Sequence, residues 1–236
     1  MSLQTEATIS AVSPREIRWN RVVAGEIYRV GLPTIVMQAI GSVMTFAVNG
    51  ILLGVSSTAV AFFGIYYKLQ NFLMMPVNGL GQAAIPVVGF NYGSGQSDRV
   101  KQAWKVLLPT GVVFALCGTA VFLLFPAQLL GLFSASQAML TIGIPAMRII
   151  CLHFLLAGVS IVLSSVFQAL GNGVFSLIVS VCRQLFVLLP AAWLLAQTGS
   201  VNNVWWAFLI AEVVSILMSL AFYARINKTT IAPLYH

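Results

Sequence analysis

The sequence predicts an all-α integral membrane protein, a bundle of six transmembrane helices. Composition is the first reason: of 236 residues, 59% are hydrophobic and only 7% are charged, with a mean hydropathy of +0.96, whereas about a quarter of the residues in a soluble domain are charged. The second reason is the length of the apolar segments, since each meets or nears the roughly 20 residues that cross about 30 Å of hydrocarbon. Segments of this length are too long for barrel strands and must satisfy their own backbone amides in lipid, so each is expected to be a helix.

The six predicted spans follow one another with short connections, at residues 32–53, 59–90, 106–125, 139–170, 174–196 and 205–222. Two of them are long enough to tilt, kink or extend beyond the bilayer. Together they form a transmembrane lobe over residues 31–225. Residues 1–30 are predicted to be a cytoplasmic linker with an interfacial segment, because basic and apolar residues mix in REIRWNRVVAGEIYRVGLP. Residues 226–236 are predicted to be a cytoplasmic tail.

Basic residues lie on one side of the predicted membrane, and in short loops such residues favour the cytoplasm. They precede the first span, separate spans two and three, and follow span six, at Arg15, Arg18, Arg21, Arg29, Arg99, Lys101, Lys105, Arg225 and Lys228. The alternate connections at 54–58, 126–137 and 196–203 contain no lysine or arginine. We therefore expect a multi-pass protein of the inner (plasma) membrane with both termini in the cytoplasm. The net charge of +7 flanks hydrophobic spans rather than a soluble face, so no nucleic-acid partner is expected.

The sequence indicates no enzyme, no cofactor and no metal site. It has no phosphate loop, no cysteine and histidine cluster at metal-ligand spacing, and no set of serine, histidine and carboxylate. The three cysteines, Cys117, Cys151 and Cys182, all lie within apolar spans, which is typical of small buried thiols rather than of metal or redox chemistry. The glycine-rich NYGSGQ at 91–96 is explained by a helix end that opens into a loop.

Polar side chains form a stripe on each of the first two spans. On the second span the offsets i, i+3, i+10 and i+14 fall on one face of a helix with 3.6 residues per turn, at Lys68, Asn71, Asn78 and Gln82. The first span has such a stripe at Gln38, Ser42, Thr45 and Asn49. Such stripes either join helices through hydrogen bonds or line a wet cavity, and their length and the lysine favour the cavity. The predicted substrate pathway is Gln38, Asn49, Lys68, Asn71, Asn78, Gln82 and Arg148.

The second span also has the composition of a hinge. Pro76 and Pro86 each remove one backbone donor and clash with the preceding turn, and Gly79 and Gly81 lie between them. The span is therefore expected to bend or unwind between about residues 75 and 86. Breaks of this kind are tolerated in a membrane only where protein or water covers them.

Ionisable residues occur at membrane depth at Arg148, His153, Arg183 and Glu212. A central charge costs about 3 kcal/mol on insertion scales, so each is expected to face the bundle interior, to pair, or to extend to the headgroups. For Arg183 the headgroups are as good an explanation as function. Glu212 continues as a polar face with Ser215 and Ser219 and is the main proton-coupling candidate. His153 is the second candidate, although a lone histidine is more often a hydrogen-bonded packing residue.

Three stretches resemble one known family. GLPTIVMQAIGSVMTFAVN in the first span, KLQNFLMMPVNGLGQAAIPVVGFNYGSG in the second and FQALGNGVFSLIVSVCRQLFVLLP at 167–190 are similar to the carboxyl-terminal half of multidrug and toxic compound extrusion (MATE) transporters. The resemblance implies one lobe of a protein with twelve helices in two six-helix lobes, with residues 1–30 as the linker between lobes. It also implies export of cationic or amphipathic drugs in exchange for protons or sodium ions.

A MATE-type lobe would work by alternating access, rocking against a second six-helix lobe about a midplane cavity. The implied partners are membrane lipid, a small-molecule substrate, a proton or sodium ion, and that second lobe. Spans one and four lack the acids that some sodium-coupled members have there, which disfavours sodium coupling through this lobe. Two alternatives stay open: a lipid-linked oligosaccharide flippase of the wider superfamily, which Lys68, Arg148 and Arg183 would suit, and a truncated membrane remnant that transports nothing.

Overall fold

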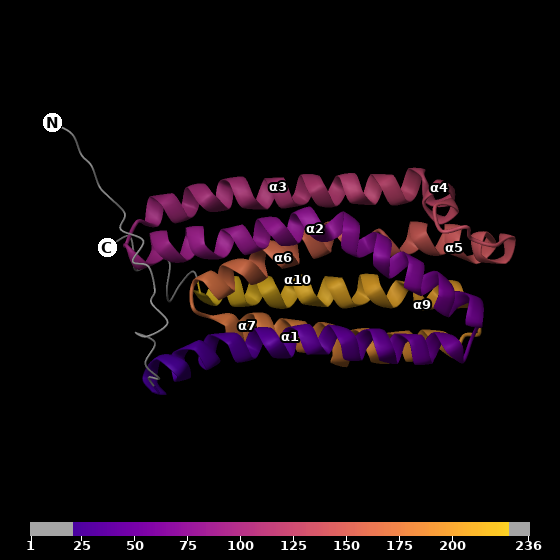
Figure 1. Ribbon diagram of the computed structural model, residues 1–236, viewed down its shortest axis with the longest axis horizontal. Helices are drawn as coiled ribbons and strands as arrows, with labels where there is room; N and C mark the ends of the chain where they lie inside the picture. The colour runs from indigo at the N-terminus through magenta and orange to yellow at the C-terminus, as the bar shows by residue number, and fades with distance from the viewer. Residues whose placement is uncertain (1–20, 227–236) are drawn as a thin grey trace, which may run out of the picture.

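The structure is a computed structural model that describes residues 21–226. The start of the predicted linker, with Arg15 and Arg18, and the predicted tail at 227–236, with Lys228, lie outside the described residues. Between residues 21 and 226 the chain is almost entirely helical and has no strand. Figure 1 shows long helices running side by side as one bundle. The predicted fold class is confirmed.

The long helices occur where the sequence predicts spans. In chain order the elements are α1 (Arg21–Leu53), α2 (Ser57–Gly93), α3 (Ser97–Leu124), α4 (Pro126–Gly131), α5 (Gln137–Ile150), α6 (His153–Ala169), α7 (Gly173–Val181), the π-helical segment η2 (Cys182–Leu188), α8 (Leu189–Ala196), α9 (Val201–Val204) and α10 (Trp206–Ile226). Five continuous helical stretches within the described residues are long and apolar enough to cross a membrane. The sixth span is the pair α5 and α6, which meet at a bend of 47°.

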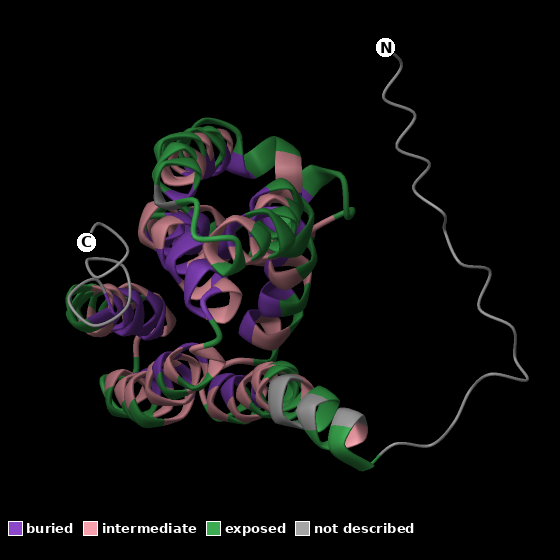
Figure 2. Ribbon diagram, turned by 90° about the vertical axis from the view of Figure 1, so that its left-hand side faces the viewer, coloured by how far each residue is buried: buried purple, intermediate pink, exposed green. Residues whose placement is uncertain are grey.

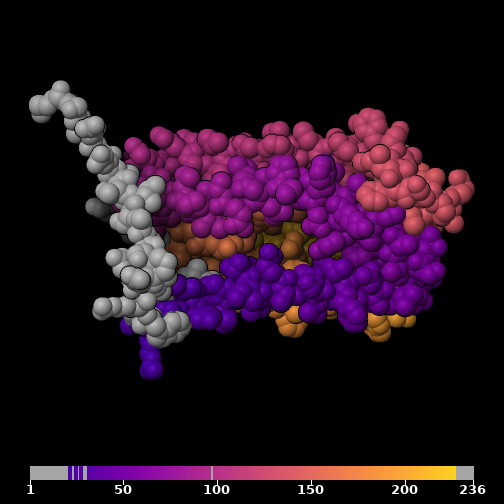
Figure 3. All heavy atoms as spheres, in the orientation of Figure 1, coloured from indigo at the N-terminus to yellow at the C-terminus, as the bar shows by residue number. Residues whose placement is uncertain are grey.

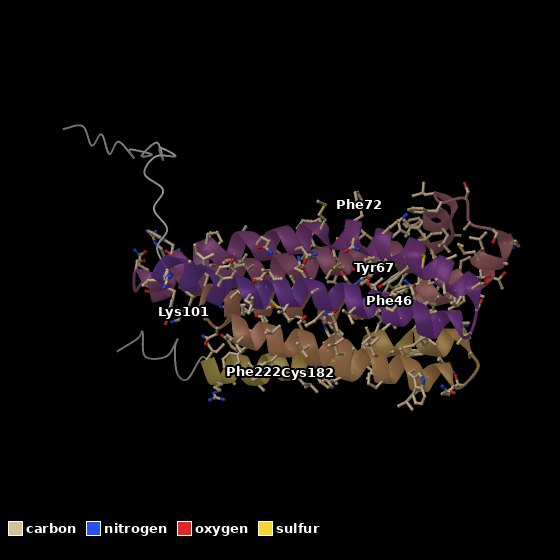
Figure 4. All side chains as sticks on the ribbon, turned by 60° about the horizontal axis from the view of Figure 1, so that its bottom comes forward. Phe46, Tyr67, Phe72, Lys101, Cys182 and Phe222 are labelled. Atoms are coloured by element: carbon tan, nitrogen blue, oxygen red, sulfur yellow. The ribbon has the colours of Figure 1, made fainter. Side chains whose placement is uncertain are left out.

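Both ends of the described chain lie at the same end of the bundle, as six crossings require (Figure 1). The basic residues gather there, because α1 and α3 begin and α10 ends at this side: Arg21, Arg99, Lys101, Lys105 and Arg225. Figure 4 shows Lys101 at this end. The one-sided charge that the sequence predicts is therefore a property of the folded bundle.

Two hydrophobic clusters form the core. The larger is aromatic and joins α2, α3, α6 and α10 at Phe62, Phe63, Tyr66, Phe122, Phe154 and Phe208, with Trp205 fully buried where α9 meets α10. The smaller cluster lies nearer the basic end and joins α2, α3, α6 and the end of α10. In Figure 2 the buried residues face the interior of the bundle, while exposed residues cover its outside. An apolar outside is expected of helices that meet lipid rather than water.

Small residues let the helices of the core approach closely. A Cβ atom added to Gly158 of α6 would lie 2.8 Å from the Cβ of Ala115 and 3.3 Å from the carbonyl oxygen of Gly111, both on α3. At Gly81 of α2 an added Cβ would lie 2.5 Å from the Oγ of Ser165 on α6. Close packing of small residues is one source of helix association in lipid, where no hydrophobic force acts between helices. Gly81 is thus a packing residue of the α2–α6 contact.

The proposed hinge in α2 does not unwind. Residues 57–93 form one α-helix with Pro76 and Pro86 inside it, and Figure 1 shows this helix curving along its length. Gly79 is exposed, and a Cβ added there would meet no atom within 4 Å. A bend without unwinding fits the effect of a proline, which removes one hydrogen bond and tilts the helix. Movement about these residues stays a prediction.

Candidate functional site

Two adjoining pockets open between α1 and α2 and reach into the bundle. Figure 3 shows the hollow between the indigo and the purple-to-magenta helices, with orange and yellow atoms of later helices at its floor. We call the first the acidic pocket; it has a volume of about 180 Å³, and its lining includes Tyr67, Gln70, His153, Arg183, Phe208 and Glu212. The second, the serine pocket, has a volume of about 310 Å³ and includes Ser160, Ser164, Ser165, Ser176, Ser180 and Ser215. Arg183 and Gln184 line both.

An ion pair lies where the two pockets meet. Nη1 of Arg183 donates a hydrogen bond to Oε2 of Glu212 over 2.9 Å. The two side chains differ in exposure, at 31% for Arg183 and 3% for Glu212. The second carboxylate oxygen, Oε1, is buried and has no hydrogen-bond partner among the described residues. Because buried polar atoms are normally paired, a lone carboxylate oxygen beside a cavity is a place for a ligand with a donor group.

The π-helical segment η2 positions Arg183 and Gln184. In an α-helix, side chains return to the same face every 3.6 residues. The wider turns of η2 accommodate an extra residue and so change which side chains face the hollow. Pro190, at the start of α8, has no N–H with which to continue an ordinary α-helical ladder. Gln184 is buried and donates from Nε2 to Oγ of Ser180 over 2.9 Å. Segments of this kind are frequent at functional sites, and this one places a guanidinium and an amide at the floor of the hollow.

His153 occupies the bend between α5 and α6. Backbone N–H groups at the bend bond the carbonyl oxygen three residues earlier rather than four. Leu152 N donates to Ile149 O over 3.3 Å, and Phe154 N donates to Cys151 O over 3.0 Å. Nδ1 of His153 bonds the carbonyl oxygen of Ile150, so the side chain takes a backbone acceptor that the bend makes available. The imidazole is buried and lines the acidic pocket. His153 is therefore both a packing residue of the bend and a polar group of the site.

Gln70 of α2 completes the surroundings of His153. Its Nε2 lies 3.3 Å from Nε2 of His153. A carbonyl oxygen can only accept, so Nδ1 must be the donor toward Ile150, which leaves Nε2 of a neutral imidazole as the acceptor for Gln70. The histidine thereby links the bend between α5 and α6 to the middle of α2.

We expect ¹⁵N NMR of the neutral His153 imidazole in the purified chain to show a protonated Nδ1 and an unprotonated Nε2. Substitution Gln70→Leu should leave the proton on Nδ1 and lower the free energy of unfolding by about 1 kcal/mol, the typical net value of one hydrogen bond. Gln82→Leu, which changes an exposed amide of the same helix, is the matched control and should leave both unchanged. A proton on Nε2 in the unmodified chain would contradict the arrangement.

The serine pocket is polar without being acidic. Amide side chains join its serines, at Gln38, Asn78, Gln82, Gln168 and Gln184, and among the described residues that line it Arg183 alone is charged. Some of its hydroxyls also hold helices together: Oγ of Ser176 donates to the carbonyl oxygen of Ser164 over 2.8 Å, which ties α7 to α6. Oγ of Ser215 reaches Oγ of Ser160 over 3.5 Å, between α10 and α6. The pocket thus offers many hydrogen bonds and one positive charge.

The structure brings together part of the predicted site. Asn71, His153 and Glu212 line the acidic pocket, and Gln38, Asn78 and Gln82 line the serine pocket. Asn49, Lys68 and Arg148 line neither pocket; Lys68 and Arg148 are exposed, and Asn49 is half-buried. Along α2 the lining is not continuous, and Figure 4 shows Phe72 at the outer edge of the bundle. The lengthwise stripes therefore meet the pockets over only part of their length.

Several lining residues were not singled out from the sequence. Tyr67 and Gln70 lie beside the stripe of α2, Gln184 follows Arg183, and the serines other than Ser215 come from α6 and α7. The sequence does contain a signal for the serines, because they recur in spans four to six, whose composition is otherwise apolar. Isolated serines are, however, equally typical of helix packing in membranes. No group of three or more His, Cys, Asp or Glu side chains within residues 21–226 is placed to hold a metal ion.

Comparisons with known proteins give one family and several relatives. Residues 33–194 match the family described as MatE. Multidrug export protein MepA of Staphylococcus saprophyticus is 27% identical over 216 residues, which cover 91% of this chain and 47% of that protein. A solved outward-facing multidrug resistance MATE family transporter of the MOP superfamily is similar with a TM-score of 0.83 and 23% identity, over 94% of this chain and 50% of that one.

A MOP superfamily transporter from Pyrococcus furiosus, whose structure is described as having a binding pocket of reverse polarity, has the same TM-score of 0.83 at 25% identity. That similarity covers 95% of this chain and 50% of the other. The chain thus spans about half the length of the relatives that it matches. The fold described above is the fold of half of such a protein.

Proposed function

Because this chain belongs to the MATE family of membrane transporters, we propose that it is the carboxyl-terminal six-helix lobe of an antiporter that exports cationic or amphipathic compounds. The observation that carries the proposal is Glu212, an acid with 3% of its side chain exposed, at the floor of a hollow that opens between α1 and α2. A buried acid inside a membrane is costly, so such a residue is by default a candidate for an ion or substrate site. The similarity to the multidrug export protein MepA supports the same conclusion.

The proposed mechanism is alternating access with a second six-helix lobe. That lobe would face α1 and α2 and close the hollow on its open side, and rocking of the two lobes would expose the cavity to each side of the membrane in turn. In this arrangement the amides of Asn71, Asn78 and Gln82 contact the substrate, and curvature of α2 at Pro76 and Pro86 accommodates the motion. The membrane is the inner (plasma) membrane, with the basic end of the bundle in the cytoplasm.

Coupling to an ion is proposed at Glu212, with His153 as its neighbour in the acidic pocket. A proton on Glu212 would neutralise the carboxylate and weaken its bond to Arg183, which changes the charge of the pocket during each cycle. His153 has its Nδ1 and Nε2 already engaged by Ile150 and Gln70, so protonation there would require Gln70 to present its oxygen instead. A proton is favoured over sodium because the pocket lining holds a single carboxylate.

The flippase alternative has one favourable observation and one unfavourable one. The serine pocket holds a positive charge among hydroxyls and amides, which suits a sugar or a phosphate. The three cations that would hold a pyrophosphate do not converge, however, because Lys68 and Arg148 lie outside both pockets while Arg183 bonds Glu212. The geometry therefore favours a site with an acid at its centre.

We expect this chain, expressed with the amino-terminal lobe of a MATE relative in cells that lack their own drug exporters, to export ethidium. The chain alone serves as the reference and should export less, because half of the cavity wall is then missing. Substitution Lys68→Gln should leave ethidium export unchanged or improved, since it removes an exposed cation that lines neither pocket and can only repel a cationic dye. Absence of ethidium export from every pairing tested would support an inert remnant, while loss of oligosaccharide-lipid transport in Lys68→Gln would support the flippase.

A further inference from the structure

We infer that Arg183 is a tethered cation that occupies the site of an organic cation on Glu212, and that it moves into the serine pocket when such a ligand binds. This inference rests on the proposed function, because it assigns to that function its binding site and the residue that sets its specificity. The observation behind it is the position of one ion pair between two pockets of different chemistry.

Glu212 is the fixed member of the pair. Its side chain is 3% exposed, one oxygen bonds Arg183, and the other is buried without a partner among the described residues. The lining beside it includes Tyr67 and Phe208, whose aromatic faces attract cations. A carboxylate with one unpaired oxygen and aromatic neighbours, in a pocket of about 180 Å³, fits the protonated or alkylated amine end of a small molecule.

Arg183 is the mobile member. Its side chain is 31% exposed and lines both pockets, so it can leave Glu212 without crossing the packed core. In the structure one of its five N–H donors bonds Glu212, and residues 21–226 provide it with no second carboxylate partner. The serine pocket offers amide and hydroxyl oxygens as acceptors for the remaining donors, at Gln38, Gln82, Gln168, Ser164 and Ser180.

An exchange of this kind keeps the buried charge balanced. Removal of one partner from a buried ion pair leaves an uncompensated charge, which is strongly unfavourable. A cationic ligand replaces the charge of Arg183 on Glu212 as the guanidinium departs, so the carboxylate stays paired throughout. The displaced guanidinium then lies beside the ligand, where a carboxylate on the same molecule would bind it.

Replacing the two residues of the pair should have opposite effects on the affinity for a cationic ligand. Loss of Glu212 removes the binding group, whereas loss of Arg183 removes the competitor of the ligand. A residue that merely holds the fold together would weaken binding when it is replaced. Binding of one dye to variants at these two positions therefore separates competition from structural support.

The experiment measures equilibrium binding of rhodamine 6G to the purified full chain in lipid nanodiscs by fluorescence anisotropy. Rhodamine 6G is a cation whose N–H groups can donate to a carboxylate, and its hydrolysed free acid is the same dye with a carboxylate in place of the ester. Relative to the unmodified chain, Arg183→Gln should bind rhodamine 6G at least about fivefold more tightly, and Glu212→Gln at least about tenfold more weakly, within the span of coupling between sites. The double variant should resemble Glu212→Gln.

Arg99→Gln is the matched control, since it removes an exposed cation of α3 that lines neither pocket. It should leave binding unchanged. Weaker or unchanged rhodamine 6G binding by Arg183→Gln, or equal tightening by Arg99→Gln, would overturn the inference. If Arg183→Gln does not fold, Arg183→Lys takes its place in the experiment. Lysine carries a point charge instead of the guanidinium fork, so it should compete less with the dye for Glu212 and tighten dye binding by a smaller factor. Weaker or unchanged binding by this variant would also overturn the inference.

The free acid tests where the displaced guanidinium goes. Its carboxylate gains a partner in the unmodified chain and loses it in Arg183→Gln, so this dye should gain less affinity from the substitution than rhodamine 6G does. Equal gains would contradict placement of Arg183 in the serine pocket. The assay needs no second lobe, so failed export with the expected binding pattern would refute the proposed function alone, and normal export without the pattern would refute this inference alone.

Discussion

Substitution Glu212→Gln is expected to lower ion-coupled ethidium export by the assembled transporter about 5- to 150-fold, which corresponds to a coupling free energy of about 1–3 kcal/mol. Glutamine keeps the shape and can still accept a hydrogen bond from Arg183, but it cannot hold a proton or pair with a cationic substrate. The defect should therefore appear in transport while the bundle stays folded. Efflux in cells, normalised to the amount of protein in the membrane, measures it.

The control for Glu212→Gln is Glu212→Asp, which keeps the charge on a shorter side chain and should recover part of the activity. Circular dichroism and the thermal midpoint of the purified variants separate loss of function from loss of fold. Ethidium export by Glu212→Gln at the rate of the unmodified protein, under the same pH gradient, would rule out this carboxylate as the coupling group. Coupling would then have to belong to the other lobe.

Substitution Gly158→Val is expected to destabilise the lobe strongly. A Cβ at this position would lie 2.8 Å from the Cβ of Ala115 and 3.3 Å from the backbone oxygen of Gly111, and valine adds two more methyl groups in the same space. Backbone cannot rotate out of the way as a side chain can, so α3 and α6 must separate. Overpacking typically costs 1–3 kcal/mol, and we expect a value at about the upper end of that range.

Gly64→Ala on α2 is the matched control for Gly158→Val, because Gly64 is exposed and an added Cβ would meet no atom within 4 Å. Alanine favours a helix over glycine by about 1 kcal/mol, so this variant should be as stable as the unmodified chain or slightly more stable. Unfolding in detergent, followed by circular dichroism, compares the two. Equal stability of both variants would show that the α3–α6 contact is looser than described.

The sequence was sufficient for the architecture because lipid imposes few solutions. A span must be helical and about 20 residues long, so composition and length alone predict six crossings. The basic residues then predict which helix ends share a side, and the structure places Arg99 and Arg225 together at that end (Figure 1). The family match to residues 33–194 confirms the resemblance drawn from the motifs of spans one, two and five.

The site was predictable only in part, since helical periodicity gives the face of a residue but not the helix that it meets. Glu212 and His153 stood out because ionisable groups in apolar spans are costly. Arg183 stood out for the same reason, but its pairing with Glu212 did not, because the two residues lie 29 positions apart on different spans. The same holds for Gln70, which lies 83 positions from His153. Asn49 and Lys68 fit the periodicity of their stripes, yet they lie outside both pockets.

The bend between α5 and α6 could not be predicted for a related reason. Cys151 and Leu152, where the helices meet, include neither proline nor glycine. The bend is stabilised by tertiary contacts: Nδ1 of His153 bonds Ile150, and Oγ1 of Thr119 on α3 lies 3.4 Å from the carbonyl oxygen of Cys151. The length of the span over residues 139–170 allows a kink, but Pro145 lies earlier in the span, so the local sequence does not place the bend at Cys151 and Leu152.

Because of the π-helical segment, side chains before and after η2 in the fifth span point in directions that one regular α-helix would not give them. An α-helix turns by about 100° per residue, so one extra residue in η2 rotates everything after it by that amount relative to an uninterrupted helix. Arg183 and Gln184 can thus face the hollow while Ala192 remains in the aromatic core. Insertion or deletion of a single codon in this span would therefore change which of its side chains face the ligand and which face the core, while the rest of the bundle stays in place.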